Sequence, residues 1–364
     1  METVHAGRQE ETIECGDPHR LAELPILLLN IHENCNCRCL MCDIWKRPPG
    51  KQLDLARLME YRESMRALRV REVVLTGGEP LLHTDFGAVC EVLKACDVKL
   101  TLLTTGLLLE RRAETVARWV DEVIISLDGP EEIHNEIRRI REAFNLIRKG
   151  IAAVRKLSPD LPICARSTVQ RANFAFLRKT VAAAQDLGFG SISFLPADIS
   201  SSAFNRELVW PVERQSQIAL TRSEVEALEN EMELLIDEYK EAIRLKYIAE
   251  SPTKLRRIVR RFHEYLGDVA PESPMCNAPW VSAVVEVDGS VRPCFFHREI
   301  GSTVSHSLED AINSSDAQQF RSTLNVADDS TCRRCVCSLN YKKSDLTDKS
   351  LNQGGPKPLS TTLS

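Results

Sequence analysis

The chain has 364 residues, 43% hydrophobic and 27% charged, values that are ordinary for a globular protein and exclude global disorder. Its 47 Lys and Arg against 52 Asp and Glu give a formal net charge of −5, which argues against a general nucleic-acid-binding protein, as does an aromatic content of only 5%. No stretch approaches the roughly 18 apolar residues that cross a bilayer, so no membrane partner is expected. The length predicts two domains, or one large domain with an appendix.

Cysteine is the unusual component of this composition. The 13 cysteines are too dilute for a disulfide-stapled scaffold, and their number is odd. The polar segment 1–23 contains no apolar signal-peptide core. We therefore expect a reducing, cytoplasmic location in which clustered cysteines bind metal or take part in chemistry.

Between residues 24 and 200, short β-rich runs alternate with segments of helical apolar spacing. Strands separated by helices indicate βαβ crossovers and a parallel sheet, either a doubly wound open sheet or most of a (β/α) barrel. Gly188 follows the last of these helices, where a C-cap glycine belongs. The predicted strands are 26–31, 73–76, 99–105, 122–127, 163–169 and 191–195. The predicted helices are 55–68, 86–95, 113–120, 143–157 and 174–187.

Residues 201–275 interrupt this alternation and are predicted to form a helical connector. Thr221 or Ser223 is expected to cap a long charged helix that runs to about Tyr247. A basic helix is expected over 255–266, and its flanking acidic residues favour a solvated face over a nucleic-acid or membrane patch. The polar segment 341–364 is predicted to be a disordered tail.

A first cysteine cluster follows the first predicted strand. Cys35, Cys37, Cys39 and Cys42 place four thiols within eight residues, where they can converge on one metal centre. A site that uses three of them leaves one coordination position open. Thiolates suit zinc or iron–sulfur centres, and spacing alone does not decide between the two.

Short polar or glycine-rich motifs follow the next predicted strands. These motifs would all lie at the carboxyl ends of parallel strands, where barrel and open-sheet enzymes place their chemistry. Turn glycines, an Asx turn at Asp128 and a solvated helix face at Arg138 are the structural alternatives. The motifs are Gly77-Gly78-Glu79-Pro80, Thr104-Thr105-Gly106, Ser126-Leu127-Asp128-Gly129, His134-Asn135-x2-Arg138 and the polar Asn173.

The spacing Cys35-x3-Cys39-x2-Cys42 resembles the signature of the radical S-adenosylmethionine (SAM) superfamily, and the motif Gly-Gly-Glu-Pro resembles that family's GGEP. The chain departs from the family at Met41, where an aromatic residue is common, and at Thr105, where the family has asparagine. The resemblance implies a partial (β/α)6 TIM-type barrel over 24–200. It also implies a [4Fe–4S] cluster that is held by Cys35, Cys39 and Cys42 and bound by SAM at its fourth iron, with Cys37 a bystander.

The same resemblance assigns the strand-end motifs to SAM. Gly77, Gly78 and Glu79 would meet its amino group, as GGEP does in the family. Ser126 and Asp128, on one side of a strand, would reach its ribose or methionine moiety. Arg138 would pair with its carboxylate.

A second cysteine group lies near the carboxyl terminus. A strand pair joined by Asp288-Gly289 separates Cys276 from Cys294, and Asp-Gly is a strong hairpin signal. Cys332-x2-Cys335 is a spacing that chelates, and Cys337 follows closely. Considered alone, this group predicts a zinc ribbon or an iron–sulfur site.

The pattern Cys276-x12-Gly289-x4-Cys294 resembles the start of the SPASM and twitch extensions of radical SAM enzymes. Five cysteines are too few for the two auxiliary clusters of a full SPASM domain. The resemblance therefore implies one auxiliary [4Fe–4S] cluster over 276–340, held by Cys276, Cys294, Cys332 and Cys335, with Cys337 as the alternative fourth ligand. The remaining cysteines, Cys15, Cys90, Cys96 and Cys164, are expected to be small packed hydrophobes.

The family resemblance implies a reaction type. A donor such as flavodoxin or ferredoxin would reduce the first cluster, SAM would be cleaved to a 5′-deoxyadenosyl radical, and this radical would abstract hydrogen from a substrate. The auxiliary cluster would accept an electron, which favours an oxidation or a bond-forming modification. A small-molecule substrate is favoured over a peptide, because about 23 residues before the first strand leave no room for a peptide-recognition domain, although a separate partner could supply one. A zinc-binding interaction protein and an electron carrier are the alternatives outside enzymes.

Overall fold

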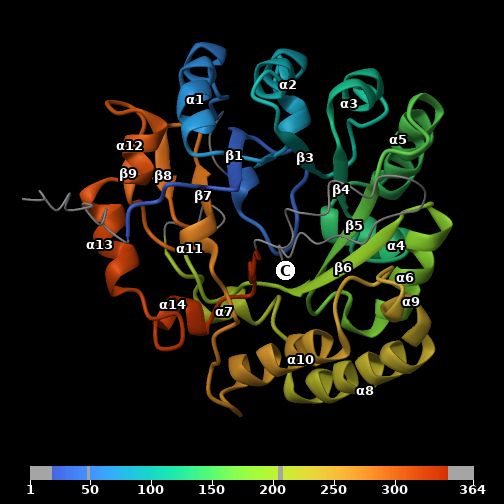
Figure 1. The fold of residues 1–364 in the computed structure, drawn as a ribbon. Helices are drawn as coiled ribbons and strands as arrows, with labels where there is room; N and C mark the ends of the chain where they lie inside the picture. Colours follow the sequence, from blue (N-terminus) through green and yellow to red (C-terminus); the bar gives the residue numbers. More distant parts are fainter. Residues whose placement is uncertain (1–18, 47–49, 204–207, 343–364) are drawn as a thin grey trace, which may run out of the picture.

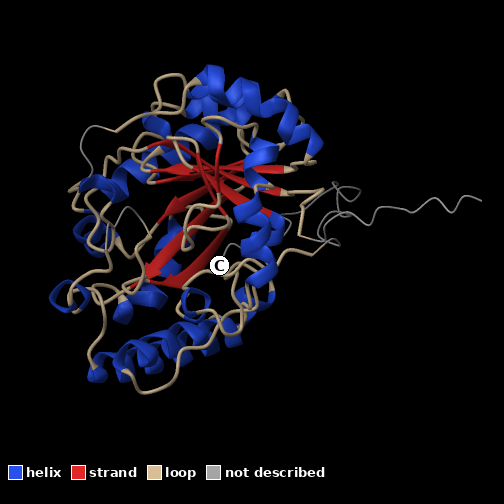
Figure 2. Cartoon of the chain, turned by 90° about the vertical axis from the view of Figure 1, so that its left-hand side faces the viewer, coloured by secondary structure: helices blue, strands red, loops and turns tan. Residues whose placement is uncertain are grey.

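A computed structural model describes residues 19–46, 50–203 and 208–342 of the chain. Its centre is one nine-stranded sheet with the order β6-β5-β4-β3-β2-β1-β7-β8-β9. The six strands from β1 to β6 pair in parallel, each with its neighbour in sequence. Figure 1 shows α1, α2, α3 and α5 on the outer side of this curved sheet, and Figure 2 shows the strands running through the interior of the molecule.

The strands are β1 (Ile26–His32), β2 (Glu72–Gly77), β3 (Lys99–Thr104), β4 (Glu122–Ser126), β5 (Ile163–Val169), β6 (Ser191–Pro196), β7 (Ser282–Val285), β8 (Ser290–Arg292) and β9 (Gly301–Ser302). The helices of the first part are η1 (Ile44–Lys46), α1 (Leu55–Ala67), η2 (Pro80–Leu82), α2 (Phe86–Lys94), α3 (Ala113–Trp119), α4 (Glu131–Arg138), α5 (Ala143–Leu157), η3 (Phe174–Phe176) and α6 (Leu177–Asp186). Those of the second part are α7 (Val212–Gln215), α8 (Arg222–Glu238), α9 (Lys240–Arg244), α10 (Pro252–Leu266), α11 (Ala278–Val281), α12 (Leu308–Ile312), α13 (Ser315–Thr323) and α14 (Ser330–Arg333).

The alternation predicted for residues 24–200 is confirmed, with each predicted strand and helix within about two residues of its observed bounds except where η3 precedes α6. The first two parallel strands, β1 and β2, are buried on both faces over most of their length and are largely apolar runs. The sheet remains open, because β6 forms one edge and β9 the other. The fold is therefore a partial barrel. Gly188 has a φ of +78° just after α6, as a C-cap glycine should.

The carboxyl-terminal hairpin β7–β8 belongs to the same sheet as the barrel strands. β7 pairs in parallel with β1, so that Ile26 lies beside Ser282 and Leu29 beside Val285. All four residues of β7 are buried, as expected for an interior strand. The second cysteine group is thereby attached to the edge of the barrel next to the strand that leads to the first group.

The long charged helix predicted to begin at Thr221 is two helices. Thr221 and Glu224 form the expected capping box, but α8 ends at Glu238 and α9 begins after Tyr239. The break lets the chain turn so that Ile243 is buried and Ile248 bridges to Ile192 of β6. One continuous helix was therefore the wrong prediction, because the tertiary packing of the segment after Tyr239 outweighs helix propensity.

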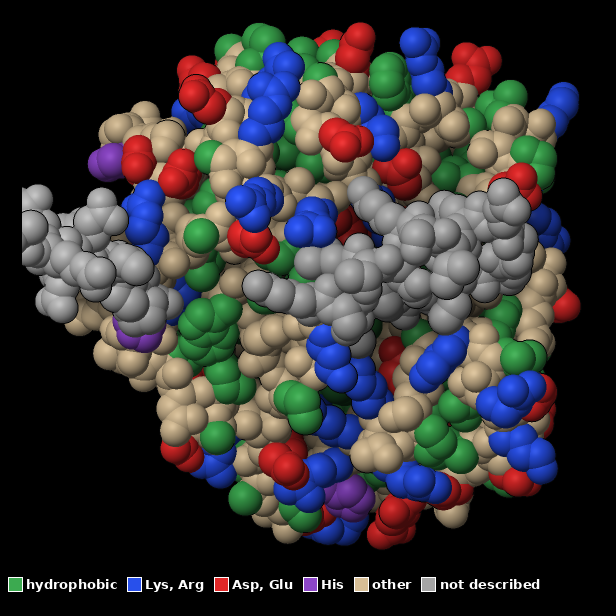
Figure 3. Space-filling model, in the orientation of Figure 1, with side chains coloured by type: hydrophobic (Ala, Val, Ile, Leu, Met, Phe, Trp, Pro, Cys, Tyr) green, Lys and Arg blue, Asp and Glu red, His purple; other side chains and the backbone are tan. Residues whose placement is uncertain are grey.

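The basic helix α10 is not a uniformly solvated face. Its cations are matched by acidic partners, with Arg256 Nε 2.6 Å from Glu233 and Arg260 Nε 3.3 Å from Glu264. Figure 3 shows Lys and Arg side chains mixed with Asp and Glu over this lower part of the molecule. Acidic and basic side chains are thus intermixed around α10, whereas Arg261 is buried and has a role described below.

The fold accounts for some of the remaining cysteines. Cys90 and Cys164 are buried, and Cys90 packs in the main core, as expected of small hydrophobes. Cys15 and the predicted tail beyond Lys342 lie outside the described residues. None of the described helices combines the length and apolarity needed to span a membrane.

Glu250, just before α10, predicts a pH-dependent stability. Burial raises the pKa of its carboxyl to about 7 from 4.5, and its Oε2 accepts a hydrogen bond from Phe194 N at 3.1 Å. The folded state thus binds this proton more tightly than the unfolded state, so the favourable contribution is present below about pH 4.5 and is lost as pH rises to about 7. Glu250→Gln should raise the free energy of unfolding at pH 8 by about 1–3 kcal/mol and leave it unchanged at pH 4. Urea denaturation at both pH values measures this difference, with the exposed Glu229→Gln as control, and an equal effect at the two pH values would contradict it.

Candidate metal centres

The first cysteine loop leaves the end of β1 and lies across the ends of β2 and β4. Its backbone is held on both sides: Glu79 N donates to Asn34 O at 2.8 Å, and Leu40 N donates to Ile137 O at 3.0 Å. Arg38 N also donates to the carbonyl of Arg138 at 3.3 Å. The loop is therefore fixed between the glycine motif after β2 and the end of α4.

The four thiols of this loop lie close together but differ in exposure. Cys37 is fully buried and Cys39 nearly so, whereas Cys35 and Cys42 are partly exposed. Backbone amides donate to two of the sulfurs, Cys37 N to Cys35 Sγ at 3.5 Å and Ile44 N to Cys42 Sγ at 3.4 Å. Amide donors of this kind stabilise cluster-bound thiolates.

The thiols of this loop differ in the direction in which their pKa values are shifted. Hydrogen bonds with Cys35 and Cys39 raise the pKa of the Cys37 thiol, so that it keeps its proton. The hydrogen bond with Cys37 and the nearby Arg138 guanidinium lower the pKa of Cys39 to about 6, whereas burial raises that of Cys42 to about 12. Of these three thiols, Cys39 is thus the one most readily converted to a thiolate, the form that binds metal.

Arg138 lies under the cluster loop, in a buried network rather than on a solvated helix face. Its Nη1 donates to Cys39 Sγ at 3.4 Å, and its Nη2 lies 2.6 Å from Asp128 Oδ2. Both side chains are almost completely buried. The solvated-face alternative for Arg138 is therefore wrong: α4 turns Arg138 inward and leaves Arg139 exposed.

Asp128 and its neighbours connect the ends of β4 and β5. Asp128 Oδ1 accepts from Thr168 N at 2.9 Å, a partner 40 residues away, so the Asx-turn alternative is wrong. Asn173 Nδ2 donates to Asp128 O at 2.8 Å and fixes the loop from the other side. Ser126 lies at the end of β4, half buried, beside Arg166 of β5.

The double glycine after β2 makes a close backbone approach to the cysteine loop. Gly77 has a φ of +129°, and a Cβ there would lie 2.4 Å from His32 O. A Cβ on Gly78 would lie 2.1 Å from Asn34 O, while Gly78 N donates to His32 O at 2.7 Å. Only glycine therefore fits at either position.

Gly78→Ala should move the cysteine loop away from the end of β2. We expect the free energy of unfolding to fall by about 1–3 kcal/mol, because the added methyl group meets backbone that has no rotamer with which to yield. Urea denaturation measures the loss. Gly190→Ala, whose Cβ would meet nothing closer than 3.7 Å, is the matched control, and an equal response of the two variants would contradict the steric account.

Both oxygens of the Glu79 carboxylate accept hydrogen bonds from other residues of the protein. Oε1 accepts from Leu81 N at 3.0 Å and Thr104 Oγ1 at 2.7 Å, and Oε2 accepts from Thr105 N and Thr105 Oγ1, both at 2.7 Å. Glu79 thus ties η2 to the end of β3. Thr105, which replaces the family's asparagine, also contacts Asn36 Oδ1 of the cysteine loop at 3.0 Å.

Buried polar atoms without partners test whether these residues fit SAM and its cluster. Asn36 Nδ2, inside the cysteine loop, and both amide atoms of the fully buried Gln170, after β5, have no hydrogen-bond partner among the described residues. A buried orphaned polar atom costs about 1–3 kcal/mol unless a ligand or water satisfies it. A polar ligand above three thiols, at the carboxyl ends of the strands, therefore fits the residues present.

The second cysteine group surrounds a pocket with a cavity volume of about 60 Å³ on the inner side of β1 and β7. Leu28 and Val284 of these strands and His297 after β8 also line this pocket. Backbone amides of Phe296 and His297 bond to Cys294, and Cys337 N donates to Cys335 Sγ at 3.4 Å. All five thiols of this group line it: Cys276, Cys294, Cys332, Cys335 and Cys337.

Long-range contacts bring these five thiols together. Asn277 N donates to Leu339 O at 2.7 Å, which fixes Cys276 beside the Cys335–Cys337 segment. The buried Arg261 of α10 donates to Arg333 O at 3.1 Å and to Cys335 O at 2.9 Å. The helical connector thus positions the final cysteine turn.

The spacing of the thiols differs from that of a single-ion site. In a tetrahedral zinc site with Zn–S of about 2.3 Å, sulfurs stand about 3.8 Å apart. Within the described residues, the one group of three candidate ligand atoms within 4.8 Å of one another is His297, Asp329 and Cys332. No three thiols of either cysteine group are that close together among the described residues.

Several contributors are not apparent in the sequence. Asn36 lies between cysteines and attracts no attention beside them, and Gln170 follows β5 without a motif. Arg261 is hidden in a run of basic residues. His297 could have been noticed, because it stands three residues after Cys294. For the others only the three-dimensional contacts identify a role.

Comparison with known proteins agrees with this geometry. Residues 29–172 match the model of the radical SAM superfamily, and residues 276–336 match that of the SPASM iron–sulfur cluster-binding domain. A probable GTP 3′,8-cyclase of Methanococcus maripaludis strain C6 is 30% identical over 135 residues, which are 35% of this chain and 45% of that protein. An AdoMet-dependent heme synthase of Methanosarcina barkeri is 25% identical over 198 residues, 50% of this chain and 56% of that protein. The matches span about half the length of these relatives.

Solved structures with the same fold cover more of the chain. SuiB of Streptococcus suis bound to S-adenosylmethionine superposes with a TM-score of 0.61 and 12% identity, covering 88% of this chain and 74% of that one. The anSMEcpe structure with bound AdoMet has a TM-score of 0.61 and 18% identity, covering 85% and 86%. The chain therefore belongs to the radical SAM superfamily and carries a carboxyl-terminal SPASM iron–sulfur cluster-binding domain.

Proposed function

We propose that the enzyme binds SAM at a [4Fe–4S] cluster held by Cys35, Cys39 and Cys42, and oxidises or cross-links its substrate with the help of one auxiliary [4Fe–4S] cluster. The observation that carries this proposal is the pairing of β1 with β7. One strand leads to the first cysteine loop and the other begins the hairpin that ends at Cys294. The two cysteine groups are therefore attached to neighbouring strands of one sheet.

Several residues around the first cysteine loop are proposed to contact SAM. The backbone of Gly77 and Gly78 lets the cysteine loop approach the end of β2 closely, and we place the SAM amino group beside this contact. Asn36 Nδ2 and the Gln170 amide are unpaired donors and acceptors for the polar parts of SAM. Ser126 remains the proposed contact to the ribose or methionine moiety of SAM.

Three of the family-implied SAM contacts act through the protein in this proposal. Glu79 holds the loops around the site, because its four hydrogen bonds come from Leu81, Thr104 and Thr105. Arg138 donates a hydrogen bond to Cys39, and Asp128 holds Arg138 in place through an ion pair. Any contact of these two side chains with SAM is made by atoms that the ion pair does not cover. When bound, the cluster and SAM supply a reductively formed carbon radical that removes a hydrogen atom from the substrate.

The auxiliary ligands that we propose are Cys276, Cys294, Cys332 and Cys335, with Cys337 as the alternative. The N–H of Cys337 donates to Cys335 Sγ, which supports Cys335 as the thiolate and Cys337 as its donor. We further propose the division of the chain into a core of 24–200, a connector of 201–275 and an auxiliary domain of 276–340.

A small molecule is the substrate class that we favour. The curated relatives by sequence are named for a nucleotide and for a heme precursor, and a pre-heme d1 synthase of Dinoroseobacter shibae is 28% identical over 137 residues. A peptide is the second candidate, because SuiB has been solved with its precursor peptide SuiA, although that likeness rests on 12% identity. A flavodoxin or ferredoxin would donate electrons, in the cytoplasm, where thiols remain reduced.

Iron content and its dependence on the two cysteine sets test this assignment. Anaerobic reconstitution of the full chain should yield about eight irons, four for each cluster. Replacing Cys35, Cys39 and Cys42 together by alanine should halve this number, and so should replacing Cys276, Cys294, Cys332 and Cys335. A colourless chain that binds zinc and no iron would contradict the proposal, and so would an unchanged iron content in either variant.

A further inference from the structure

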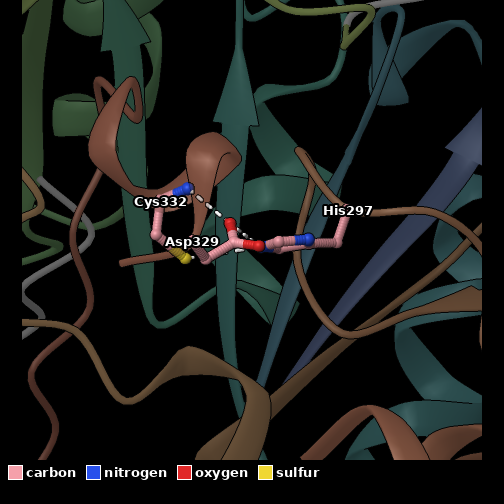
Figure 4. Close-up of side chains that lie close together, drawn as sticks. All are labelled: His297, Asp329 and Cys332. Carbon is pink, nitrogen blue, oxygen red and sulfur yellow. Dashed lines mark hydrogen bonds and ion pairs between the residues drawn. The ribbon is translucent and has the colours of Figure 1, made fainter. Parts of the chain in front are cut away.

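His297 stands at the auxiliary centre but belongs to none of the cysteine motifs. It follows β8 in the turn that begins at Cys294, is 8% exposed, and lines the pocket that the five thiols surround. Its Nε2 lies 3.4 Å from Cys332 Sγ. Figure 4 shows the imidazole of His297 meeting Asp329 and Cys332, which come from a different segment.

We propose that the His297 side chain donates its Nε2–H to the sulfur of Cys332 and thereby raises the reduction potential of the auxiliary cluster. This inference rests on the proposed function, because it assumes that Cys332 is a cluster ligand. A sulfur bound to iron carries no proton, so the hydrogen of the His297–Cys332 contact must then come from the imidazole. A donor directed at a ligand sulfur stabilises the reduced cluster, which carries the additional negative charge.

Asp329 is the competing acceptor for the Nε2–H of His297. It lies farther from Nε2 than the sulfur of Cys332 does, so the hydrogen bond goes to the sulfur. Asp329 Oδ1 lies 3.6 Å from His297 Nε2, farther than the sulfur does. The same oxygen already accepts from Thr331 N at 2.9 Å and Cys332 N at 2.8 Å, because Asp329 caps α14. Asp329 thus fixes the Cys332 turn, and His297 is left facing Cys332 Sγ.

His297 therefore connects two cysteines that are far apart in the chain. Its backbone N–H bonds to Cys294, and its side chain reaches Cys332. Phe320 of α13 holds the ring in place edge-on, with ring centroids 4.9 Å apart at 65°. Arg292 Nη1 donates to His297 O at 3.3 Å and fixes the turn from the other side. A substitution of the side chain leaves the backbone bond to Cys294 intact, so the two contributions can be separated.

The test measures the midpoint potential of the auxiliary cluster alone. The parent is the full chain in which Cys35, Cys39 and Cys42 are replaced by alanine, so that only the auxiliary cluster contributes to an EPR-monitored redox titration. His297→Leu retains bulk and loses the donor, and His297→Gln retains an N–H of similar reach. Phe320→Leu is the matched control, since it removes the ring contact and leaves the hydrogen bond.

We expect His297→Leu to lower the ratio of reduced to oxidised cluster about tenfold at a fixed potential, which is about 59 mV for a one-electron couple. His297→Gln and Phe320→Leu should stay close to the parent. An unchanged potential in His297→Leu with full iron content would overturn the hydrogen-bond proposal and leave the auxiliary cluster standing. Loss of the cluster in both His297 variants would also overturn it, because His297 would then be a ligand or a packing requirement. A parent chain that binds no iron would instead contradict the proposed function itself.

Discussion

Cys39→Ala should abolish the reductive cleavage of SAM by the reconstituted enzyme. Cys39 is the proposed ligand that receives the Arg138 hydrogen bond, and its loss leaves two thiolates for a cluster that needs three. The measurement is the amount of 5′-deoxyadenosine formed under anaerobic reduction, which should fall to the level of the uncatalysed control.

Cys37→Ala is the matched control for this experiment. Cys37 lies in the same loop and is even more buried than Cys39, at 0% against 5% exposed. If disturbed packing were the cause of inactivity, Cys37→Ala would be at least as harmful. We expect it to retain cleavage and iron content, and its complete inactivity beside an active Cys39→Ala would reverse the proposed ligand assignment.

Asp128→Ala should produce the largest loss of stability. It leaves the buried Arg138 guanidinium without its carboxylate and Thr168 N without its acceptor, since Asp128 is fully buried and the pair is 2.6 Å apart. Breaking a buried ion pair by removing one partner costs about 3–5 kcal/mol. Urea denaturation of the wild-type and variant chains measures this loss.

The exposed pair Arg244–Glu241 provides the comparison for Asp128→Ala. It has an N–O distance of 2.5 Å, but both side chains are more than 60% exposed. Glu241→Ala should leave the midpoint of denaturation unchanged, because water replaces the interaction. A similar loss in the two variants would mean that burial does not govern the Asp128–Arg138 pair.

The barrel could be predicted from sequence because its information is local. Runs such as that of β2 are largely apolar, lie between helical segments and end at turn residues, so their limits follow from the chain itself. The cysteine loop was equally accessible, because its ligands lie within eight residues. The placement of these loops at the carboxyl ends of strands then follows from parallel pairing.

The attachment of the second cysteine group could not be predicted in the same way. That β7 pairs with β1 depends on residues more than 250 positions apart, and nothing in the hairpin sequence specifies that neighbour. The only sign of this pairing in the sequence is that the run of β7 lacks alternating polar residues, because the strand is fully buried. A short apolar run alone does not say which strand covers it.

Polar residues at the site illustrate a second limit. The sequence assigns Glu79, Asp128 and Arg138 to SAM by resemblance, whereas the folded chain gives each of them protein partners. The orientation of α4 about its axis decides that Arg138 faces Cys39 while Arg139 faces solvent. Because neighbouring residues point in different directions from a helix, the sequence alone does not show which of the two arginines is buried. Orphaned atoms such as Asn36 Nδ2 become visible only after every other hydrogen bond has been assigned.

The most direct test of the account is a single turnover of the unmodified enzyme with SAM. The full chain is reconstituted anaerobically, reduced chemically and mixed with SAM, and 5′-deoxyadenosine and methionine are quantified together. We expect both products to form in equal amounts, and neither to form when Cys35, Cys39 and Cys42 are replaced by alanine. A chain that carries both reduced clusters and leaves SAM intact would contradict it.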